Sequence, residues 1–452
     1  MVRLSKDVEI AADARGVCLH SPDQPALDLN CRELEWLETF MHQSTRLTNA
    51  TNGTERVEDQ QHDNGLKGED YSQLLKRLDR RGWLVHSLRY REVSLVSCVP
   101  VRPPSRPLPR ATPTGGWLQF SHATLIRPSQ GGWRLGVPGA WAHLRVHDQH
   151  LLPSLYGLAE GCMAAEWLSG CSKYPRQVRR DLILLMKWSQ ILGLDSGLEG
   201  WNLQDLWFHT ATRRGYSREP LGKEKATPTE RQRSILHLAQ PIGVGIVDLE
   251  RPDPEHWRSQ DPPFAMVCEH RRSRREPSQR PISKEEVSNF LFRSMASRHG
   301  HQLYPSGGGC YSVRTYLAVH HCEDLSCGAY FYDPNRHRLK ILETDRHLLS
   351  QLFKEQSATA NSCRWPQIGI LLTADYGRVR KYYPRLAYSL ILKEVGAIMQ
   401  TMMLAARVTG LDSCPLGCGN ETLISKLIGT DSALEPTVGE LMLIRTQKQA
   451  PD

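Results

Sequence analysis

The chain has 452 residues, too many for one ordinary hydrophobic core, so two to four domains are expected. Hydrophobic residues make up 40% of it, and no segment approaches about twenty unbroken apolar residues, so the composition predicts a globular protein without a transmembrane helix. The net charge of +8 is spread along the chain, which favours a solvated basic surface over a nucleic-acid-binding face.

The N-terminus and the cysteines indicate a reducing compartment. Residues 1–8 lack the apolar core of a signal peptide, so a cytoplasmic location is expected and the 12 cysteines should be thiols. The pairs Cys322/Cys327 and Cys414/Cys418 differ from the two-residue gap usual in zinc sites. Buried free cysteine is therefore favoured, and no metal site is predicted.

Residues 1–104 have the outline of a winged-helix domain, with two helices followed by a hairpin. Apolar periodicity predicts helices over 34–40 and 71–81, separated by a mobile polar loop over 45–69. Gly82 is expected to cap the second helix, and strands over 83–88 and 92–99 should form the hairpin. The proline-rich stretch 99–113 then predicts an extended linker.

Residues 114–195 resemble the first module, and an internal duplication and a chance likeness are equally open. The expected elements are strands over 118–126, 133–137 and 142–146, and helices over 151–160 and 176–192. Residues 196–262 are expected to be a helical linker whose aromatic stripe, 201–209, packs at a domain interface.

Residues 263–452 predict a layered α+β domain. The expected helices cover 283–295, 345–356, 384–408 and 421–428, and the expected strands cover 315–320, 329–333, 368–373 and 440–444. At the first of these helices, Ser283 and Glu286 have the spacing of a capping box.

A glycine run in this domain is the most informative segment. Pro305–Ser312 places three glycines directly before a strand, where the missing Cβ atoms leave room for a ligand to approach the backbone. Upstream, Arg271–Arg275 is a candidate anion site, because guanidinium and hydroxyl groups grip phosphate by charge-assisted hydrogen bonds. Taken separately, each of these signals has a plainer interpretation as a tight turn or a solvated cluster.

Two further segments point to chemistry. Lys381 and Tyr382 lie in the turn before Pro384, and a lysine beside a phenol lowers the pKa of the phenol and makes it a usable base. Gly417 and Gly419 follow a strand-like stretch, and either close approach to a planar ligand or a capping loop explains them. Together these segments predict a phosphorylated cofactor beside a proton-transfer pair.

In this order, the segments resemble the flavin-dependent azoline dehydrogenases of the SagB/ThcOx type, in the nitroreductase superfamily. The resemblance covers 263–452 and rests on Arg271–Arg275, Pro305–Gly309, Gly328–Pro334, Arg380–Tyr382, Glu394–Gln400, Gly410–Cys414 and Glu435–Glu440. The earlier modules are more loosely similar to the two peptide-clamp domains that precede the flavin domain in longer members. Cys310 and Cys418 stand where apolar or glycine residues are commoner in the family.

The resemblance implies a C-terminal nitroreductase-like FMN domain preceded by two small winged-helix-like peptide-clamp domains. It implies FMN bound at a homodimer interface, with Arg445 a candidate for a further phosphate ligand. The implied positions are Arg272, Ser273 and Arg275 at the phosphate and ribityl end, Ser306, Gly307 and Gly308 across the flavin, Gly417 and Gly419 near the isoalloxazine, and Lys381 and Tyr382 as the catalytic pair.

The implied reaction removes two hydrogens from a thiazoline or oxazoline of a ribosomally made peptide and yields the aromatic azole. Hydride would pass to flavin N5, the Lys381/Tyr382 pair would take the proton, and oxygen would reoxidise the flavin. The implied partners are the azoline-containing precursor peptide and a second copy of the chain, with the cyclodehydratase of the same pathway as a further candidate. No nucleic-acid or membrane partner is predicted.

Three other functions fit parts of the sequence. A general nitroreductase acting on small aromatics leaves the long N-terminal region unexplained. A DNA-binding regulator would use Arg77, Arg80 and Arg81 on its recognition helix, but Asp79 and the apolar remainder argue against base readout. A peptide-binding scaffold without flavin is the third alternative.

Overall fold

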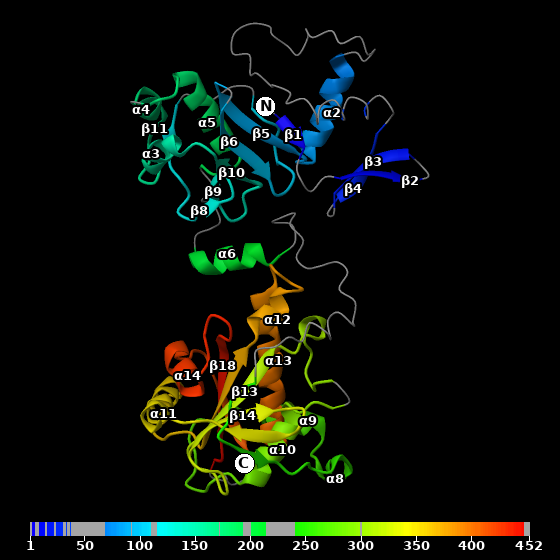
Figure 1. Cartoon of the computed structure of the whole chain (residues 1–452), viewed down its shortest axis with the longest axis vertical. Helices are drawn as coiled ribbons and strands as arrows, with labels where there is room; N and C mark the ends of the chain where they lie inside the picture. The colour runs from blue at the N-terminus through cyan, green and yellow to red at the C-terminus, as the bar shows by residue number, and fades with distance from the viewer. Residues whose placement is uncertain are drawn as a thin grey trace. The chain divides into compact units, whose positions relative to one another are not determined.

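The computed structural model divides the chain into two compact units, Met1–Pro220 and Leu221–Asp452 (Figure 1). Each unit is described by itself. The described residues are 2–4, 9–13, 16–21, 24–29, 33, 37, 68–91, 93–109, 115–170, 172–192, 200–213, 240–298 and 301–446.

Unit 2 is built on a seven-stranded antiparallel sheet with strand order β12-β15-β14-β13-β16-β18-β17. Its strands are β12 (Gly245–Asp248), β13 (Val313–Val319), β14 (Gly328–Asp333), β15 (Arg338–Ile341), β16 (Ile368–Ala374), β17 (Asp412–Leu416) and β18 (Thr437–Ile444). Every residue of β16 is buried, as expected for a central strand whose sheet is covered on both faces.

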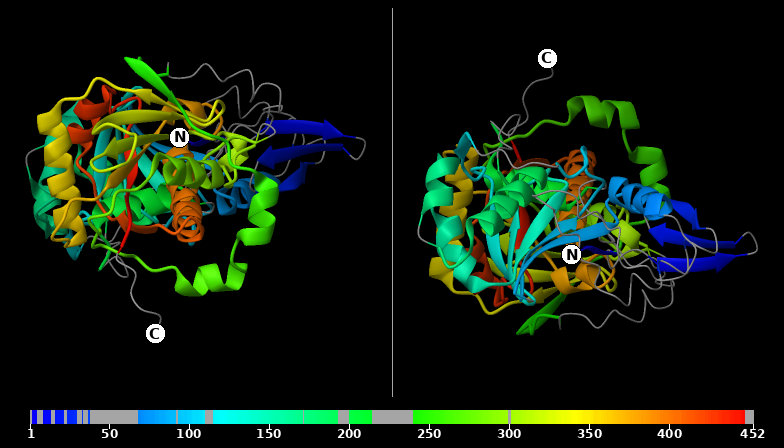
Figure 2. Two further views of the ribbon diagram at one scale, coloured as in Figure 1. Left: turned by 90° about the horizontal axis from the view of Figure 1, so that it is seen from below. Right: turned by 90° about the horizontal axis from the view of Figure 1, so that it is seen from above.

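Helices cover both faces of this sheet (Figures 1 and 2). One face packs against α10 (Lys284–Ser294) and α13 (Ala387–Val408), the other against α11 (Arg346–Ala360) and α14 (Glu421–Ile428). Ile370 and Leu371 are neighbours on β16 yet belong to the two different cores, because successive strand residues point to opposite faces. The shorter helices are α8 (Pro254–Gln260), α9 (Phe264–His270) and α12 (Tyr376–Arg380).

Helix α13 is the longest element of unit 2. By length and composition it is the one described helix that could cross a membrane. In this structure it is the central helix of unit 2, where Ile391, Ile398 and Met402 are fully buried in the core that also contains β13, β16 and β18 side chains.

The α+β class predicted for the C-terminal region is confirmed, and the predicted helices and strands are present there with shifted ends. Ser283 and Glu286 form the predicted capping box at the start of α10. Strands β12 and β15 were not predicted, and β17 was indicated only as a strand-like stretch before Gly417. Because β12 pairs with β15, the sheet takes one strand from within 196–262.

Unit 1 contains a six-stranded sheet with strand order β1-β5-β6-β10-β9-β8. Its strands are β1 (Val2–Leu4), β5 (Leu84–Tyr90), β6 (Val93–Pro100), β8 (Leu125–Ser129), β9 (Gly132–Gly136) and β10 (Ala142–Val146). A separate three-stranded sheet holds β2 (Glu9–Asp13), β3 (Gly16–Ser21) and β4 (Gln24–Leu29), and a two-stranded ribbon holds β7 (Trp117–Leu118) and β11 (Cys162–Met163). The helices are α2 (Gly68–Arg80), α3 (Leu152–Tyr156), α4 (Ala164–Ser169), α5 (Arg176–Trp188) and α6 (Leu203–Ala211).

Several predictions for unit 1 hold. Helix α2 is followed by Gly82 with a φ of 63°, and β5 and β6 form the predicted hairpin. The described residues of the proline-rich stretch after β6, 101–109, contain neither helix nor strand. Pairing of β6 with β10 joins the two predicted modules into one sheet. Their winged-helix identity and the boundaries at 104 and 114 stay predictions.

Other expectations need correction. The strand expected over 118–126 is interrupted by a turn in which Thr124 N donates to Ser121 O, so β7 and β8 are separate. The helix expected over 151–160 ends at Tyr156, and α5 ends at Trp188 instead of 192. Residues 45–67 of the predicted loop 45–69 lie outside the described residues. Of the predicted helix 34–40, only Leu37 is described, and it is helical.

Candidate functional site

Three of the predicted site segments lie at the same end of the unit 2 sheet. The glycine loop ends just before β13, whose first residue, Val313, pairs with Ala374 at the end of β16. The Lys381–Tyr382 turn follows β16 through α12, and Gly417 follows the end of β17. Antiparallel pairing thus brings segments about seventy and a hundred residues apart to the same edge.

The glycine loop is fixed by Glu394 of α13. Ser306 Oγ donates to Glu394 Oε2 at 2.7 Å, and Ser312 N donates to Oε1 at 3.0 Å. Ser306 Oγ also accepts from Tyr311 N at 2.8 Å, which closes the loop on itself. Glu394 is only 3% exposed, and burial raises the pKa of its carboxyl group. Sequence reasoning quoted Glu394 as part of a motif but did not assign it this role.

The conformation and packing of the chain itself explain why glycine is needed at positions of this loop. Gly308 and Gly309 have φ values of 65° and 66°, the left-handed region that other residues rarely adopt. A Cβ on Gly308 would lie 2.5 Å from Tyr383 Oη, whereas a Cβ on Gly309 would meet nothing within 4 Å. Close approach by a ligand is therefore not needed to explain Gly308, because Tyr383 already occupies that space.

The predicted catalytic pair is divided between two environments. Asp375 caps α12 by accepting from Arg378 N at 3.0 Å, and Lys381 is the C-cap residue of that helix. Lys381 is exposed, while Tyr382 is 6% exposed and packs in the core beneath α13. The next residue, Tyr383, links this turn to the glycine loop through its contact with Gly308.

A cation that the sequence did not single out faces the same place. Burial lowers the pKa of Arg378, and this is opposed by the negative charges of Asp375 and Glu394. The spacing of Arg378 three residues after the capping Asp375 was the available signal, but a short cap carries no functional meaning by itself.

The predicted anion cluster runs beside β17. Ser273 and Ser413 form an isolated parallel β-bridge, and Arg274 N donates to Ser413 O at 3.1 Å. Arg272 and Arg275 have exposed side chains, and Arg275 hydrogen-bonds the Cys414 thiol. The backbone thus places this segment at the sheet edge with its guanidinium groups accessible.

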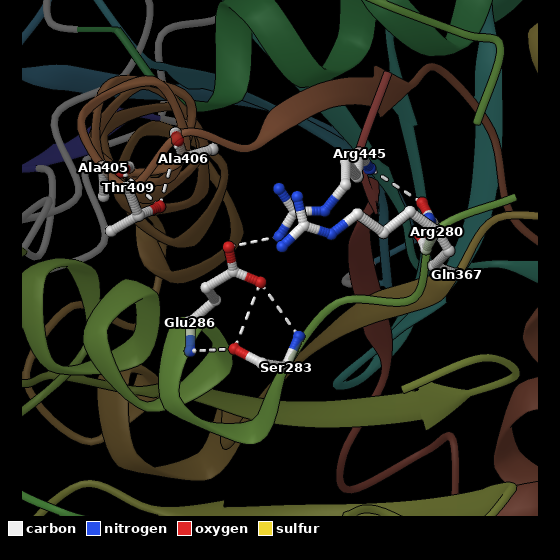
Figure 3. A network of polar contacts seen from close by, with 8 residues as sticks. All are labelled: Arg280, Ser283, Glu286, Gln367, Ala405, Ala406, Thr409 and Arg445. Atoms are coloured by element: carbon white, nitrogen blue, oxygen red, sulfur yellow. Dashed lines mark hydrogen bonds and ion pairs between the residues drawn. The ribbon is translucent and has the colours of Figure 1, made fainter. Parts of the chain in front are cut away.

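Arg445 directly follows β18, beside the start of β17 and at the end of the sheet opposite the glycine loop (Figure 3). It forms an ion pair with Glu286, and its carbonyl oxygen accepts from Ser278 N at 2.6 Å. Figure 3 shows the guanidinium of Arg280 beside that of Arg445. Arg445 Nε and Ser278 Oγ are buried and find no hydrogen-bond partner among the described residues. Two guanidiniums facing one carboxylate, with donors left over, fit a phosphate group.

Gly417 and Gly419 differ in what surrounds them. Both are exposed, and a Cβ on Gly417 would meet nothing within 4 Å. A Cβ on Gly419 would lie 1.8 Å from Glu440 Oε1, so the absent side chain makes room for Glu440. Glu440 is 4% exposed and accepts from Gln356 Nε2 at 2.9 Å, and burial raises the pKa of its carboxyl group to about 7.

No metal centre accompanies these groups in the described ranges. There, no group of three or more His, Cys, Asp or Glu side chains is arranged to hold a metal ion. Cys322, Cys327, Cys414 and Cys418 are all free thiols.

Comparisons with known proteins concern mainly unit 2. Residues 268–443 match the nitroreductase family, so the C-terminal region contains a nitroreductase-family domain. A protein of Methanocaldococcus jannaschii named "putative nitroreductase" is 26% identical over 186 residues, which covers 40% of this chain and 89% of the relative.

Two solved structures show a partial likeness. The Escherichia coli microcin synthetase McbBCD complex with truncated pro-MccB17 bound includes a chain 14% identical, with a TM-score of 0.35, covering 54% of this chain and 92% of that one. A Desulfovibrio desulfuricans structure is named a "putative nitroreductase in complex with FMN". Its chain is 18% identical with a TM-score of 0.29, covering 42% of this chain and 93% of that one.

Proposed function

We propose that this chain is an FMN-dependent dehydrogenase that oxidises thiazoline or oxazoline rings of a ribosomally made peptide to azoles. The observation that carries the proposal is the meeting of the glycine loop and the Lys381–Tyr382 turn at one sheet end, inside the region that matches the nitroreductase family. The motifs, in their order along the chain, resemble those of azoline dehydrogenases, and this favours an azoline peptide as the substrate.

FMN is the cofactor, and the residues at the β17–β18 edge fit its phosphate. Arg272, Ser273 and Arg275 hold the phosphate and ribityl end, and the unpartnered donors of Arg445 and Ser278 support an anion at this corner. Ser306, Gly307 and Gly308 would form the loop across the flavin, and Gly417 and Gly419 would lie near its ring system. When bound, FMN supplies the hydride acceptor.

The chain itself handles the proton. Aromatisation of an azoline breaks two C–H bonds, and the hydrogen that does not leave as hydride leaves as a proton. Lys381 is exposed at the end of α12, where a bound peptide can reach it, and the adjacent Tyr382 is buried in the core. Together they would take the proton, and oxygen would serve as the final electron acceptor.

The active form is a homodimer formed through α13. Tyr388 and Leu392 are 41% and 39% exposed on this apolar helix, and a Cβ on Gly396 would meet nothing within 4 Å. An uncovered apolar face on a core helix is an expected self-association surface. The azoline-bearing precursor peptide is the substrate partner, and the cyclodehydratase that makes the azoline is the enzyme expected to act before this one.

The decisive experiment is mass spectrometry of an azoline-bearing peptide incubated with the purified, FMN-loaded protein. Each ring oxidised should lower the mass by about two units, since two hydrogens are lost. Reduction of small nitroaromatics without any change in azoline peptides would favour the general nitroreductase. A protein that never takes up FMN would overturn both enzymatic functions.

Substitutions then test the catalytic pair. Lys381→Ala and Tyr382→Phe should each retain FMN, seen as an unchanged flavin absorption band, and should abolish azole formation. Arg336→Ala, at an exposed arginine before β15, is the matched control and should behave as wild type. Full activity in both pair variants would remove their proposed role.

A further inference from the structure

Three arginines form a row across neighbouring strands of the unit 1 sheet. Arg145 on β10 pairs directly with Arg134 on β9, and Arg134 pairs with Arg127 on β8 (Figure 1). Directly paired residues of antiparallel strands share one face of a sheet. Neighbouring strands lie about 4.8 Å apart, so the row spans about 10 Å.

Two of the three arginines, Arg127 and Arg145, have no ion-pair partner among the described residues. Like charges directly opposite each other destabilise a sheet, so such a row needs a reason. Arg145 Nε is also buried without a hydrogen-bond partner among those residues. Arg127 is exposed, and Arg134 and Arg145 are half-buried, so the row faces outward at one end.

His143 lies on the same face and reports the field there. It is 8% exposed, and burial lowers its pKa to about 3, with the positive charges of the three arginines adding to the effect. No carboxylate of the described residues contributes to this shift. The imidazole is therefore neutral at physiological pH, and its buried Nδ1 has no partner in the described part of the chain.

The row has defined borders. Along β9, the ring of Trp207 of α6 approaches Gly136, two residues from Arg134, and its Nε1 donates to Ala123 O at 3.2 Å. Beyond β10, Ser97 pairs with Arg145 and with Ser87, which continues the row as hydroxyl groups. The cationic strip is thus bordered by two serines at one end and by an indole beside its middle strand.

We propose that this strip, formed by Arg127, Arg134 and Arg145, binds an acidic segment of a peptide or protein partner. Guanidinium groups bind carboxylates in paired, charge-assisted hydrogen bonds. In an extended peptide, side chains on one face repeat about every 6.8 Å, so two acidic side chains fit within the length of the strip. The inference concerns unit 1 and does not depend on the flavin chemistry proposed for unit 2.

The size of the strip favours a carboxylate partner over a nucleic acid. Nucleic-acid-binding faces carry extended stripes of cations that follow many phosphates. Here the cations stop after three strands, and the bordering helix α6 has the acidic Asp205 in its first turn. A short acidic stretch is neutralised by this strip, whereas a polynucleotide would extend past it.

The test measures fluorescence anisotropy of a labelled octaglutamate peptide with the full-length protein. Arg145→Gln should weaken binding about tenfold, because a partly buried charged hydrogen bond is lost, and Arg127→Gln about threefold. Arg176→Gln, at an exposed arginine on α5, is the control and should leave the affinity unchanged. Raising the salt from about 0.01 M to about 0.15 M should weaken wild-type binding.

Thermal unfolding of the same variants separates binding from a structural role. Because each substitution relieves repulsion within the row, Tm should stay level or rise. Failure of octaglutamate to bind would overturn the inference, as would an equal loss of affinity in Arg176→Gln. A fall in Tm with unchanged affinity would assign the row a structural role instead. Tighter binding of labelled single-stranded oligothymidylate, lost in the same variants, would make the partner a nucleic acid.

Discussion

Ser306 at the start of the glycine loop donates a 2.7 Å hydrogen bond to Glu394 in the middle of α13, 88 residues later in the chain. The same carboxylate accepts from the backbone and hydroxyl of Ser312 at the other end of the loop. One buried group of the core helix therefore holds both ends of the segment that lies across the proposed flavin site.

Replacing this carboxylate should loosen the loop. In Glu394→Gln, one acceptor oxygen becomes an amide donor that faces the hydroxyl or backbone donors of Ser306 and Ser312. We expect the free energy of unfolding to fall by about 1–3 kcal/mol, the usual cost of a buried unsatisfied group, and FMN affinity to fall with it. Urea unfolding and flavin titration measure the two effects.

Glu343→Gln is the control for this change, since Glu343 is an exposed carboxylate in the turn before α11. It should alter neither quantity. If Glu394→Gln matched the control in both measurements, the loop would not depend on this anchor.

Substitutions in the glycine loop should separate backbone strain from steric contact. Gly309→Ala places a side chain in open space at a φ of 66°, which costs about 1–2 kcal/mol. Gly308→Ala has the same strain at a φ of 65° and also places its Cβ against the Tyr383 ring, so it should cost more. Unfolding free energies of the two variants, compared with wild type, measure the difference. Equal costs would mean that Tyr383 moves aside without penalty.

The sequence predicts well the elements whose signals are local. Helix α14 begins and ends as expected because Asn420 caps its start and Gly429, with a φ of 69°, ends it. Strand β17 was indicated only weakly, because it is short, contains Pro415 and depends on its pairing with β18. Strand β12 likewise depends on β15, about ninety residues away, and has no strong pattern of its own.

The candidate site shows the same division. The glycine loop stands out in the sequence because three glycines are rare together, but its anchor, Glu394, is assigned only when α13 is packed against the sheet. The burial of Tyr382 beside an exposed Lys381 is set by the turn after α12, which adjacent residue types do not reveal. These features of the site are determined by packing between segments that are distant in the sequence.

Glu440 should make the stability of unit 2 depend on pH. Burial raises its pKa from the ordinary 4.5 to about 7, with the nearby Glu355 adding to the effect. Between these values the folded chain retains a proton that the unfolded chain has released, so stability should fall as pH rises through this window. The full effect is on the order of 3 kcal/mol.

Unfolding free energies near pH 5 and pH 8 test this dependence. Glu440→Gln keeps an acceptor for Gln356 and cannot ionise, so the drop in stability across the window should shrink markedly. Glu355→Gln should reduce the drop without removing it. A wild-type protein equally stable at both pH values would show that Glu440 ionises without cost.

The uncovered apolar face of α13 gives a test of the proposed homodimer. Leu392→Glu places a charge on this face, at a side chain 39% exposed in the single chain, so the fold should persist while the dimer dissociates. Light scattering after size-exclusion chromatography should give a dimer for wild type and a monomer for the variant. Leu434→Glu, at a leucine 55% exposed in the turn before β18, is the matched control and should remain dimeric. A monomeric wild type, or a dimer unaffected by Leu392→Glu, would place the self-association surface elsewhere or remove it.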